Sequence, residues 1–188
     1  KISILENVKD KVDSLLIGGG MAATLLKAKS YETGLSLVEE DKLDFALRLM
    51  EDTAQQGVNV LLPVDVVVAD RLNPEAEVKV DWIWVQKTEL KIVDIGPFTI
   101  NSFSRELERC KTIFWNGPLG MYEIPQFAAG TQAMGRLLAN LTATTVIGGG
   151  STAEAVIEMK LADKMTFIST GGGASLRFLS GEALPGVE

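Results

Sequence analysis

The stretch TTVIGGGSTA, residues 144–153, joins a β-branched run to a triple glycine that opens onto a helical pattern. The stretch SLLIGGGMAA, residues 14–23, shares its Ile-Gly-Gly-Gly-x-x-Ala pattern, and a third triple glycine occupies residues 171–173. Because glycine has no Cβ, the backbone at such a turn can adopt positive φ and approach a ligand closely. Free N–H groups at the following helix start attract an anion. The three turns therefore predict contacts with phosphate groups.

Short apolar runs alternate with amphipathic segments along the chain. Strands are expected at residues 14–17, 58–62, 66–69, 91–94, 112–115, 144–147 and 165–169. Helices are expected at residues 2–12, 21–29, 41–56, 99–109, 125–140, 151–159 and 174–179. Because parallel strands covered on both faces are continuously apolar, this alternation predicts a parallel, multi-layer sheet in one domain. Residues 70–90 interrupt this alternation of strands and helices, and they predict a turn followed by a small antiparallel excursion.

The glycine turns are expected to share one site. In a parallel sheet all strand-to-helix turns leave the same edge, and ligands bind outside that edge. Hydroxyl groups follow the second and third turns at Ser151, Thr152 and Ser175, as helix caps or phosphate ligands. The alternative is that glycine only permits tight helix–sheet packing, and at residues 18–20 packing or adenine contact is as well supported as phosphate contact.

Two standard nucleotide motifs test this interpretation. The Lys-Ser/Thr pair of a Walker A loop follows none of the three turns, so the chain is not a P-loop NTPase. A dinucleotide fingerprint is matched loosely at residues 18–23 and 148–153, with Glu39 and Glu40 about 20 residues beyond the first match. Those glutamates are expected to open a helix rather than to end a strand. An NAD-binding domain and a non-catalytic interaction domain stay open as alternatives.

Composition excludes several classes of protein. The 188 residues contain no histidine, which excludes zinc sites built on histidine and Ser-His or Cys-His triads. The net charge of −7 argues against nucleic-acid binding, and no apolar run reaches the length of a membrane span. One cysteine, Cys110, excludes an internal disulfide framework and fits a reducing compartment. Because the chain opens on Lys1 rather than methionine, we expect it to be part of a longer protein.

The stretch FWNGPLG, residues 114–120, predicts a rigid loop at the end of a strand. It offers Asn116 and backbone groups to a ligand, and Glu123 just beyond it is either a ribose contact or a solvated loop acid. Asp94, in the similar strand-end turn VDIGP at residues 93–97, is best interpreted as a turn residue or a helix N-cap.

These motifs occur together in one order. They are IGGGMA (17–22), VDIGP (93–97), FWNGPLG (114–120), FAAGT (127–131), VIGGG (146–150), STGGGAS (169–175) and LPGV (184–187). In this order the chain resembles the C-terminal, nucleotide-binding domain of phosphoglycerate kinase, and STGGGAS together with WNGP is highly specific. The resemblance implies an α/β fold, a three-layer αβα Rossmann-like domain with a mostly parallel sheet, over residues 1–188. It also implies binding of ADP or ATP with Mg²⁺.

The resemblance also implies roles for particular residues. Adenine is expected near Gly19, Gly20, Leu37, Leu72 and Val93. Ribose and linking contacts are expected from Asn116, Pro118, Met121 and Glu123, and phosphate contacts from Gly149, Gly150 and Thr152. The catalytic groups are expected to be Lys1, which matches a phosphate-binding lysine of the family, and Gly172 and Gly173, which stabilise the phosphoryl group during transfer.

The chain departs from the family pattern at the metal position. The family usually has aspartate after the second triple glycine, where it helps to hold magnesium, and this chain has Ser151. A neutral hydroxyl is a weaker ligand for a hard cation, so the metal ligands stay unknown. The complete family enzyme transfers a phosphoryl group between 1,3-bisphosphoglycerate and ADP, and binds 3-phosphoglycerate on an N-terminal domain that is absent here. The resemblance implies a cytoplasmic or plastid monomer, and we expect the chain alone to be inactive.

Overall fold

The computed structural model describes residues 2, 4–85, 89–169, 171 and 173–181. The strands are β1 (Ser14–Leu16), β2 (Asn59–Leu61), β3 (Asp65–Ala69), β4 (Val78–Trp82), β5 (Lys91–Ile95), β6 (Thr112–Asn116), β7 (Thr144–Gly148) and β8 (Phe167–Ser169). The α-helices are α1 (Ile4–Val8), α2 (Gly19–Ala28), α3 (Leu43–Gln55), α4 (Pro97–Leu107), α5 (Ala129–Leu138), α6 (Gly150–Glu158) and α7 (Ala174–Ser180). Single 3₁₀ turns lie at η1 (Lys9–Lys11), η2 (Glu40–Lys42), η3 (Pro125–Phe127) and η4 (Ala162–Lys164).

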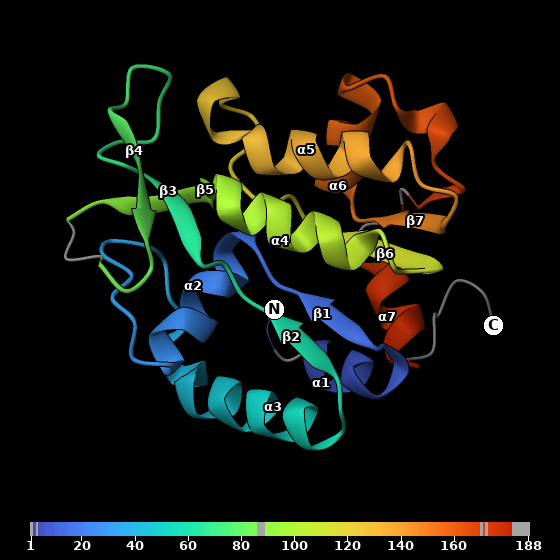
Figure 1. Cartoon of the computed structure of the whole chain (residues 1–188), viewed down its shortest axis with the longest axis horizontal. Helices are drawn as coiled ribbons and strands as arrows, with labels where there is room; N and C mark the ends of the chain where they lie inside the picture. The colour runs from blue at the N-terminus through green and yellow to red at the C-terminus, as the bar shows by residue number, and fades with distance from the viewer. Residues whose placement is uncertain (1, 3, 86–88, 170, 172, 182–188) are drawn as a thin grey trace.

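Two groups of parallel strands form the centre of the fold. β1 pairs with β2, and β6, β7 and β8 form a three-stranded sheet in that order. Helices α2 and α3 pack against each other, and in Figure 1 α2 lies beside β1 and β2 and α3 below them, whereas α4 and α5 lie above them. The predicted α/β class, with parallel strands between layers of helices, is confirmed.

The antiparallel excursion predicted within residues 70–90 is confirmed as β4. The antiparallel sheet to which β4 belongs contains more of the chain than expected. β4, β3 and β5 form a separate antiparallel sheet with β3 in the middle. The expectation that residues 66–69 and 91–94 form further parallel strands is therefore wrong. A parallel neighbour needs a crossover of a dozen or more residues, whereas only residues 62–64 separate β2 from β3. After that short bend, β3 runs into a hairpin with β4 and the chain returns on its other side.

Helix boundaries shift in a consistent way. α2 and α6 begin at Gly19 and Gly150, two residues and one residue before the predicted starts, so glycine backbone belongs to their first turns. α4 begins at Pro97, because proline is well suited to the first helical position. The predicted helices at residues 2–12, 41–56 and 125–140 each contain a 3₁₀ turn beside a shorter α-helix.

The main apolar core packs β6 and β7 against α4, α5 and α6. Its members are Ile95, Phe103, Ile113, Trp115, Leu119, Met134, Leu138, Ile147, Val156 and Met165. Full burial of such side chains stabilises a fold by roughly 1.5–3 kcal/mol each. Leu119 belongs both to this core and to the FWNGPLG loop, so the packing that stabilises the sheet also holds the loop in place.

A buried carboxylate joins β3 to α4. Asp65 Oδ1 accepts hydrogen bonds from the Thr99 backbone N–H at 2.7 Å and from the Thr99 hydroxyl at 2.7 Å, and Asp65 Oδ2 accepts one from the Phe98 N–H at 3.0 Å. Through these contacts the Asp65 side chain of β3 satisfies backbone N–H groups at the start of α4.

Within the described residues, every helix is too short or too polar to cross a membrane.

Candidate functional site

Residues 116–120, the last residue of β6 and the loop that follows it, connect the first two glycine turns. At one end the Gly19 N–H donates to Leu119 O at 3.1 Å. At the other end the Gly117 N–H donates to Thr152 Oγ1 at 2.7 Å. Gly117 has φ of 101°, a conformation that favours glycine, and its carbonyl accepts from Trp115 Nε1 at 2.8 Å. The loop is therefore rigid, as predicted, and it brings the starts of α2 and α6 to one place.

Other parts of the protein fill the space around most of the first glycine turn. A Cβ at Gly18 would lie 2.5 Å from Leu119 Cδ2, and a Cβ at Gly19, where φ is 59°, would lie 2.9 Å from Pro118 O. Gly20 differs, because a Cβ there would meet no heavy atom within 4 Å. At Gly18 and Gly19 the packing interpretation accounts for the glycines, and Gly20 faces open space.

The second turn is more open. Gly149 has φ of 86°, and a Cβ at Gly150 would meet no heavy atom within 4 Å. Asn116 Oδ1 lies 3.2 Å from the position of a Cβ at Gly149, and this buried oxygen has no hydrogen-bond partner among the described residues. Buried polar atoms are normally satisfied, so an orphaned acceptor next to an open helix start indicates a missing partner. Thr152 is buried, and its hydroxyl oxygen already accepts from Gly117.

The third turn follows the neighbouring strand. Asn116 lies opposite Gly148 across β6 and β7, and Gly148 lies opposite Ser169 across β7 and β8, so the three strand ends are level. A Cβ at Gly173 would meet no heavy atom within 4 Å. The Ser175 hydroxyl donates to Ser169 Oγ at 2.7 Å, which satisfies that candidate ligand locally. The predicted catalytic residues Lys1 and Gly172 lie outside the described residues.

The residues expected near adenine and ribose lie on several elements of the fold. Val93 is buried, and its carbonyl accepts from the Met121 N–H at 2.9 Å, so these two predicted residues are in contact. Leu72 is 42% exposed in the connection between β3 and β4, and Leu37 is 89% exposed in the segment after α2. Glu123 is exposed, and Pro118 is half-buried at the first turn.

The segments that carry Leu37 and Leu72 are both fixed to the rest of the fold by hydrogen bonds. Gln126 Nε2 donates to Asn73 O at 3.0 Å, which holds the connection carrying Leu72 against η3. The Ile92 N–H donates to Ser36 Oγ at 2.9 Å, which fixes the segment carrying Leu37 beside β5. Leu37 and Leu72 therefore lie on segments that are each attached to the fold by a neighbouring residue.

Asp94 lies beneath the loop and was predicted only as a turn residue or cap. Its Oδ2 accepts from the Gly130 N–H and its Oδ1 from the Ile95 N–H, both at 2.8 Å. A Cβ at Gly120 would lie 2.4 Å from Asp94 Oδ1. Burial raises the pKa of Asp94 to about 6, against the opposing effect of its backbone hydrogen bonds. The Asp94 carboxyl group thus holds the end of the loop next to the start of α5. The residue type alone did not predict this contact with α5.

The surroundings of α6 contain few carboxylates for a metal. Ser151 is exposed in the first turn of the helix. Glu154, one turn further on, accepts a hydrogen bond from the Tyr122 hydroxyl at 3.2 Å. Burial and the neighbouring glutamates raise the pKa of Tyr122 to about 12. Among the described residues, no group of three or more acidic or cysteine side chains is placed to hold a metal ion.

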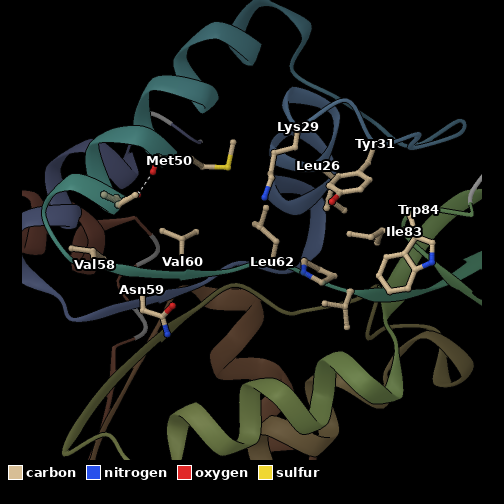
Figure 2. A pocket seen from close by; sticks show the side chains of 14 residues that line it. Leu26, Lys29, Tyr31, Met50, Val58, Asn59, Val60, Leu62, Ile83 and Trp84 are labelled. Carbon is tan, nitrogen blue, oxygen red and sulfur yellow. Dashed lines mark hydrogen bonds between the residues drawn. The ribbon is translucent and has the colours of Figure 1, made fainter.

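A cavity of about 460 Å³ lies away from the glycine turns, between α2, α3 and β2. Figure 2 shows Lys29, Tyr31 and Trp84 around one part of it and Met50 and Val60 on its other walls. The cavity meets α2 near its C-terminal end, whereas the first glycine turn forms the N-terminal end, about 15 Å away for a ten-residue helix. None of the predicted site residues that the structure describes lines this cavity.

Level strand ends, open glycine backbone and a shared rigid loop define a Rossmann-like α/β domain with its glycine turns gathered at one side of the parallel strands. A family model described as phosphoglycerate kinase matches residues 1–182. The chain belongs to the phosphoglycerate kinase family.

Individual relatives agree with this assignment. A phosphoglycerate kinase of Synechococcus sp. (strain JA-2-3B'a(2-13)) is 50% identical over 190 residues, which cover 100% of this chain and 46% of that protein. A phosphoglycerate kinase of Clostridioides difficile (strain 630) is 50% identical over 188 residues, or 47% of its length. The solved structure of phosphoglycerate kinase from Coxiella burnetii superposes with a TM-score of 0.94 at 43% identity, over 97% of this chain and 47% of that one. The chain thus spans about half the length of the relatives it matches.

Proposed function

We propose that this chain is the nucleotide-binding half of a phosphoglycerate kinase and that it binds ADP or ATP at the glycine turns. The complete protein, in this proposal, reversibly transfers a phosphoryl group between 1,3-bisphosphoglycerate and ADP, which yields 3-phosphoglycerate and ATP. Membership of the family supports the reaction class. The NAD hypothesis has no comparable support, because Glu40 opens a 3₁₀ turn and not the end of a strand.

One observation carries the proposal: the unpartnered Asn116 Oδ1 beside the open start of α6. A ribose hydroxyl supplies the donor that this oxygen lacks. The N–H groups at Gly149 and Gly150 can then donate hydrogen bonds to the phosphate oxygens, aided by the positive end of the helix dipole. Gly20 offers a second open backbone position across the same loop.

The proposed mechanism is one of positioning and charge neutralisation, without a covalent intermediate on the protein. Phosphoryl transfer requires stabilisation of the charge on the equatorial oxygens, which backbone N–H groups and a lysine ammonium can provide without a titrating base. We assign that role to Gly173, Gly172 and Lys1. The acceptor site for 3-phosphoglycerate belongs to the other half of the protein, so the chain alone is proposed to bind nucleotide and not to turn over.

Magnesium is proposed to arrive on the phosphates of the nucleotide. The described residues do not by themselves form a magnesium site, since Ser151 offers one neutral oxygen and Glu154 is engaged by Tyr122. Hard cations of this kind prefer several oxygen ligands with negative charge. In the proposed mechanism the protein's own contribution is therefore made by backbone N–H groups and a lysine.

The location of the protein is proposed to be cytoplasmic, with the plastid as the alternative. A relative from Nicotiana tabacum, 50% identical over 194 residues, is named a cytosolic phosphoglycerate kinase. We further propose that 3-phosphoglycerate binds only to the other half of the longer polypeptide.

Calorimetric titration of the chain with ADP, ADP plus Mg²⁺ and NADH tests the proposal. We expect saturable binding of ADP and none of NADH, and no conversion of 1,3-bisphosphoglycerate by the chain alone. Gly150→Val fills space that the folded chain leaves empty, so it should preserve folding and weaken ADP binding roughly tenfold or more.

Ala129→Val is the control, because it also introduces a valine at the exposed first residue of a helix, α5, outside the three turns. Its ADP affinity should equal that of the unchanged chain. Preference for NADH would favour the dinucleotide alternative. The absence of nucleotide binding by a folded sample would favour a non-catalytic interaction domain.

A further inference from the structure

The cavity between α2, α3 and β2 lies where two apolar clusters of the fold meet. One cluster packs α2 and α3 on β1 and β2, and a second packs α2 on β3. Leu62, in the bend at residues 62–64, packs against both clusters and lines the cavity. The volume of about 460 Å³ is within the range of small-molecule sites, roughly 300–1,000 Å³. The cavity is therefore large enough for a ligand of its own.

The apolar walls of the cavity are held in place by the folded core. Leu26 and Ile83 are 1% and 7% exposed, and both belong to the second cluster. Met50 and Val60 pack against the first cluster from α3 and β2. Because these side chains are already ordered, a ligand binds without the entropic cost of fixing the walls.

Trp84 supplies a flat aromatic wall. Its ring stacks on Trp82, which does not line the cavity, with ring centroids 4.9 Å apart and an interplanar angle of 18°. The Val85 N–H donates to Trp82 O at 3.0 Å, and this turn keeps the two residues together. Trp84 is nevertheless 61% exposed, so much of its ring is available to a ligand. Aromatic rings prefer offset stacking, so this wall favours a planar ligand.

Two polar side chains reach the cavity from the end of α2. The Lys29 N–H donates to Leu25 O at 3.1 Å and the Tyr31 N–H donates to Leu26 O at 3.0 Å, so backbone groups alone close the helix end. Ser30 has φ of 64°, a conformation that turns the chain back over the end of a helix. This turn places Lys29 and Tyr31 on the same wall, and Figure 2 shows both side chains directed into the cavity.

The charge of this wall determines the kind of ligand. In the part of the chain that the structure describes, the Lys29 ammonium and the Tyr31 hydroxyl have no hydrogen-bonding or ionic partner. Lys29 is also the one charged residue among the described residues that line the cavity. An ammonium beside a hydroxyl donor is a suitable partner for a carboxylate. Because one positive charge is present, a monoanion is matched better than a doubly charged phosphate.

We propose that this cavity binds a small aromatic carboxylate. The ring lies between Trp84 and the aliphatic side chains of Val60 and Leu62, and the carboxylate accepts hydrogen bonds from Lys29 and Tyr31. The cavity and the first glycine turn are at opposite ends of α2, so this site does not depend on nucleotide binding. A ligand of about 14 non-hydrogen atoms should bind with a dissociation constant on the order of 0.1 mM.

Calorimetric titration of the chain with 2-naphthylacetate and with 2-naphthylacetamide tests the proposal. The two ligands have the same shape, and the amide lacks the negative charge. We expect saturable binding of the carboxylate with one site per chain, and affinity for the amide lower by about tenfold. Saturating ADP should leave the affinity for the carboxylate unchanged.

Two lysine variants test the polar wall. Lys29→Met removes the ammonium and keeps most of the apolar stem, so the affinity for 2-naphthylacetate should fall by about tenfold and that for the amide should not change. Lys27→Met is the matched control, because it makes the same change two residues earlier on α2, outside the cavity lining. It should leave both affinities unchanged.

A third variant tests the location. Ala54 lies at an exposed position of α3 and lines the cavity, so Ala54→Phe fills the space from the surface without disturbing the core. Binding of both ligands should be lost. Circular dichroism and urea unfolding should show that each variant keeps the fold.

Several results would overturn the proposal. Equal affinities for the carboxylate and the amide, or an unchanged affinity in Lys29→Met, would remove the role of Lys29. Retained binding in Ala54→Phe, or competition with ADP, would place the ligand elsewhere on the chain. A chain that binds ADP and not 2-naphthylacetate would lack this site and keep the proposed nucleotide function.

Discussion

The first and second glycine turns share the pattern Ile-Gly-Gly-Gly-x-x-Ala, yet their surroundings differ. In the first turn Gly19 donates its N–H to Leu119 O, and added side-chain atoms at Gly18 and Gly19 would collide with the loop. In the second turn Gly150 faces empty space and the neighbouring Asn116 Oδ1 lacks a partner.

The difference shows that one motif serves two physical purposes in this chain. Glycine in the first turn mainly permits the backbone of residues 116–120 to approach α2. Glycine in the second turn leaves backbone N–H groups accessible at a helix start. A glycine motif therefore predicts the shape of a turn, and only the neighbouring loop decides whether that turn receives protein or ligand.

The largest expected effect concerns packing in the first turn. Gly19→Val combines a β-branched side chain at φ of 59° with a Cβ 2.9 Å from Pro118 O, and it should reduce the free energy of unfolding by about 4 kcal/mol. Urea unfolding measures the loss. Gly20→Val, in the same turn but with open space around its Cβ, should cost far less. Equal losses would remove the distinction between packed and open positions.

The next effect concerns Asp94, which supports the loop that both turns share. Its pKa is about 6 in the folded chain and 3.8 when unperturbed, so the folded state binds more protons between these values. The stabilisation by the protonated group is complete below pH 3.8 and is lost as the pH rises through 6. The free energy of unfolding should thus fall by on the order of 2–3 kcal/mol over that interval.

The contribution of Asp94 is isolated by comparison with Asp94→Asn, which cannot titrate. The difference in unfolding free energy between the unchanged chain and this variant should decrease steadily from pH 4 to pH 7. A difference that is constant with pH would show that Asp94 does not have a raised pKa.

A smaller effect is expected at Asn116, which lies beside the open second glycine turn. Asn116→Leu removes a buried acceptor that has no partner among the described residues, so stability should rise by about 1 kcal/mol or stay unchanged. The ADP affinity should fall in the same variant. Paired urea unfolding and calorimetry separate the two responses. A loss of stability would mean that Asn116 is already satisfied in the free chain, by water for example.

The smallest effect is expected at Ser151. Ser151→Asp adds a carboxylate at the exposed start of α6, which should increase the dependence of ADP affinity on Mg²⁺ by a few-fold. Titrations with ADP, with and without Mg²⁺, measure the ratio of affinities for both chains. An unchanged ratio would indicate that this position does not face the phosphates.

The strand and helix order could be predicted from sequence because apolar runs and glycine turns are local signals. β6 and β7 extend only one residue beyond their predicted ranges, and the excursion at β4 is present. The antiparallel direction of β5 could not be predicted, because it depends on the short bend at residues 62–64 and on which side of β3 the chain returns.

Candidate site residues could be found by motif, but their roles depend on contacts between distant segments. The bond between Gly117 and Thr152 joins residues 35 positions apart, and it engages a hydroxyl that was expected to meet phosphate. Asp94 supports the loop through Gly130, 36 positions away. These two hydrogen bonds depend on how the strands and helices are arranged in space, and the type of a single residue does not predict that arrangement.

Trp115 gives the chain a built-in optical reporter. Its indole is 9% exposed and donates to Gly117 O at 2.8 Å, whereas Trp82 and Trp84 are 36% and 61% exposed. Emission from the shielded ring should lie at shorter wavelength than emission from the two more solvated rings. A change at the Asn116–Gly120 loop should therefore alter the short-wavelength part of the fluorescence of the unlabelled protein.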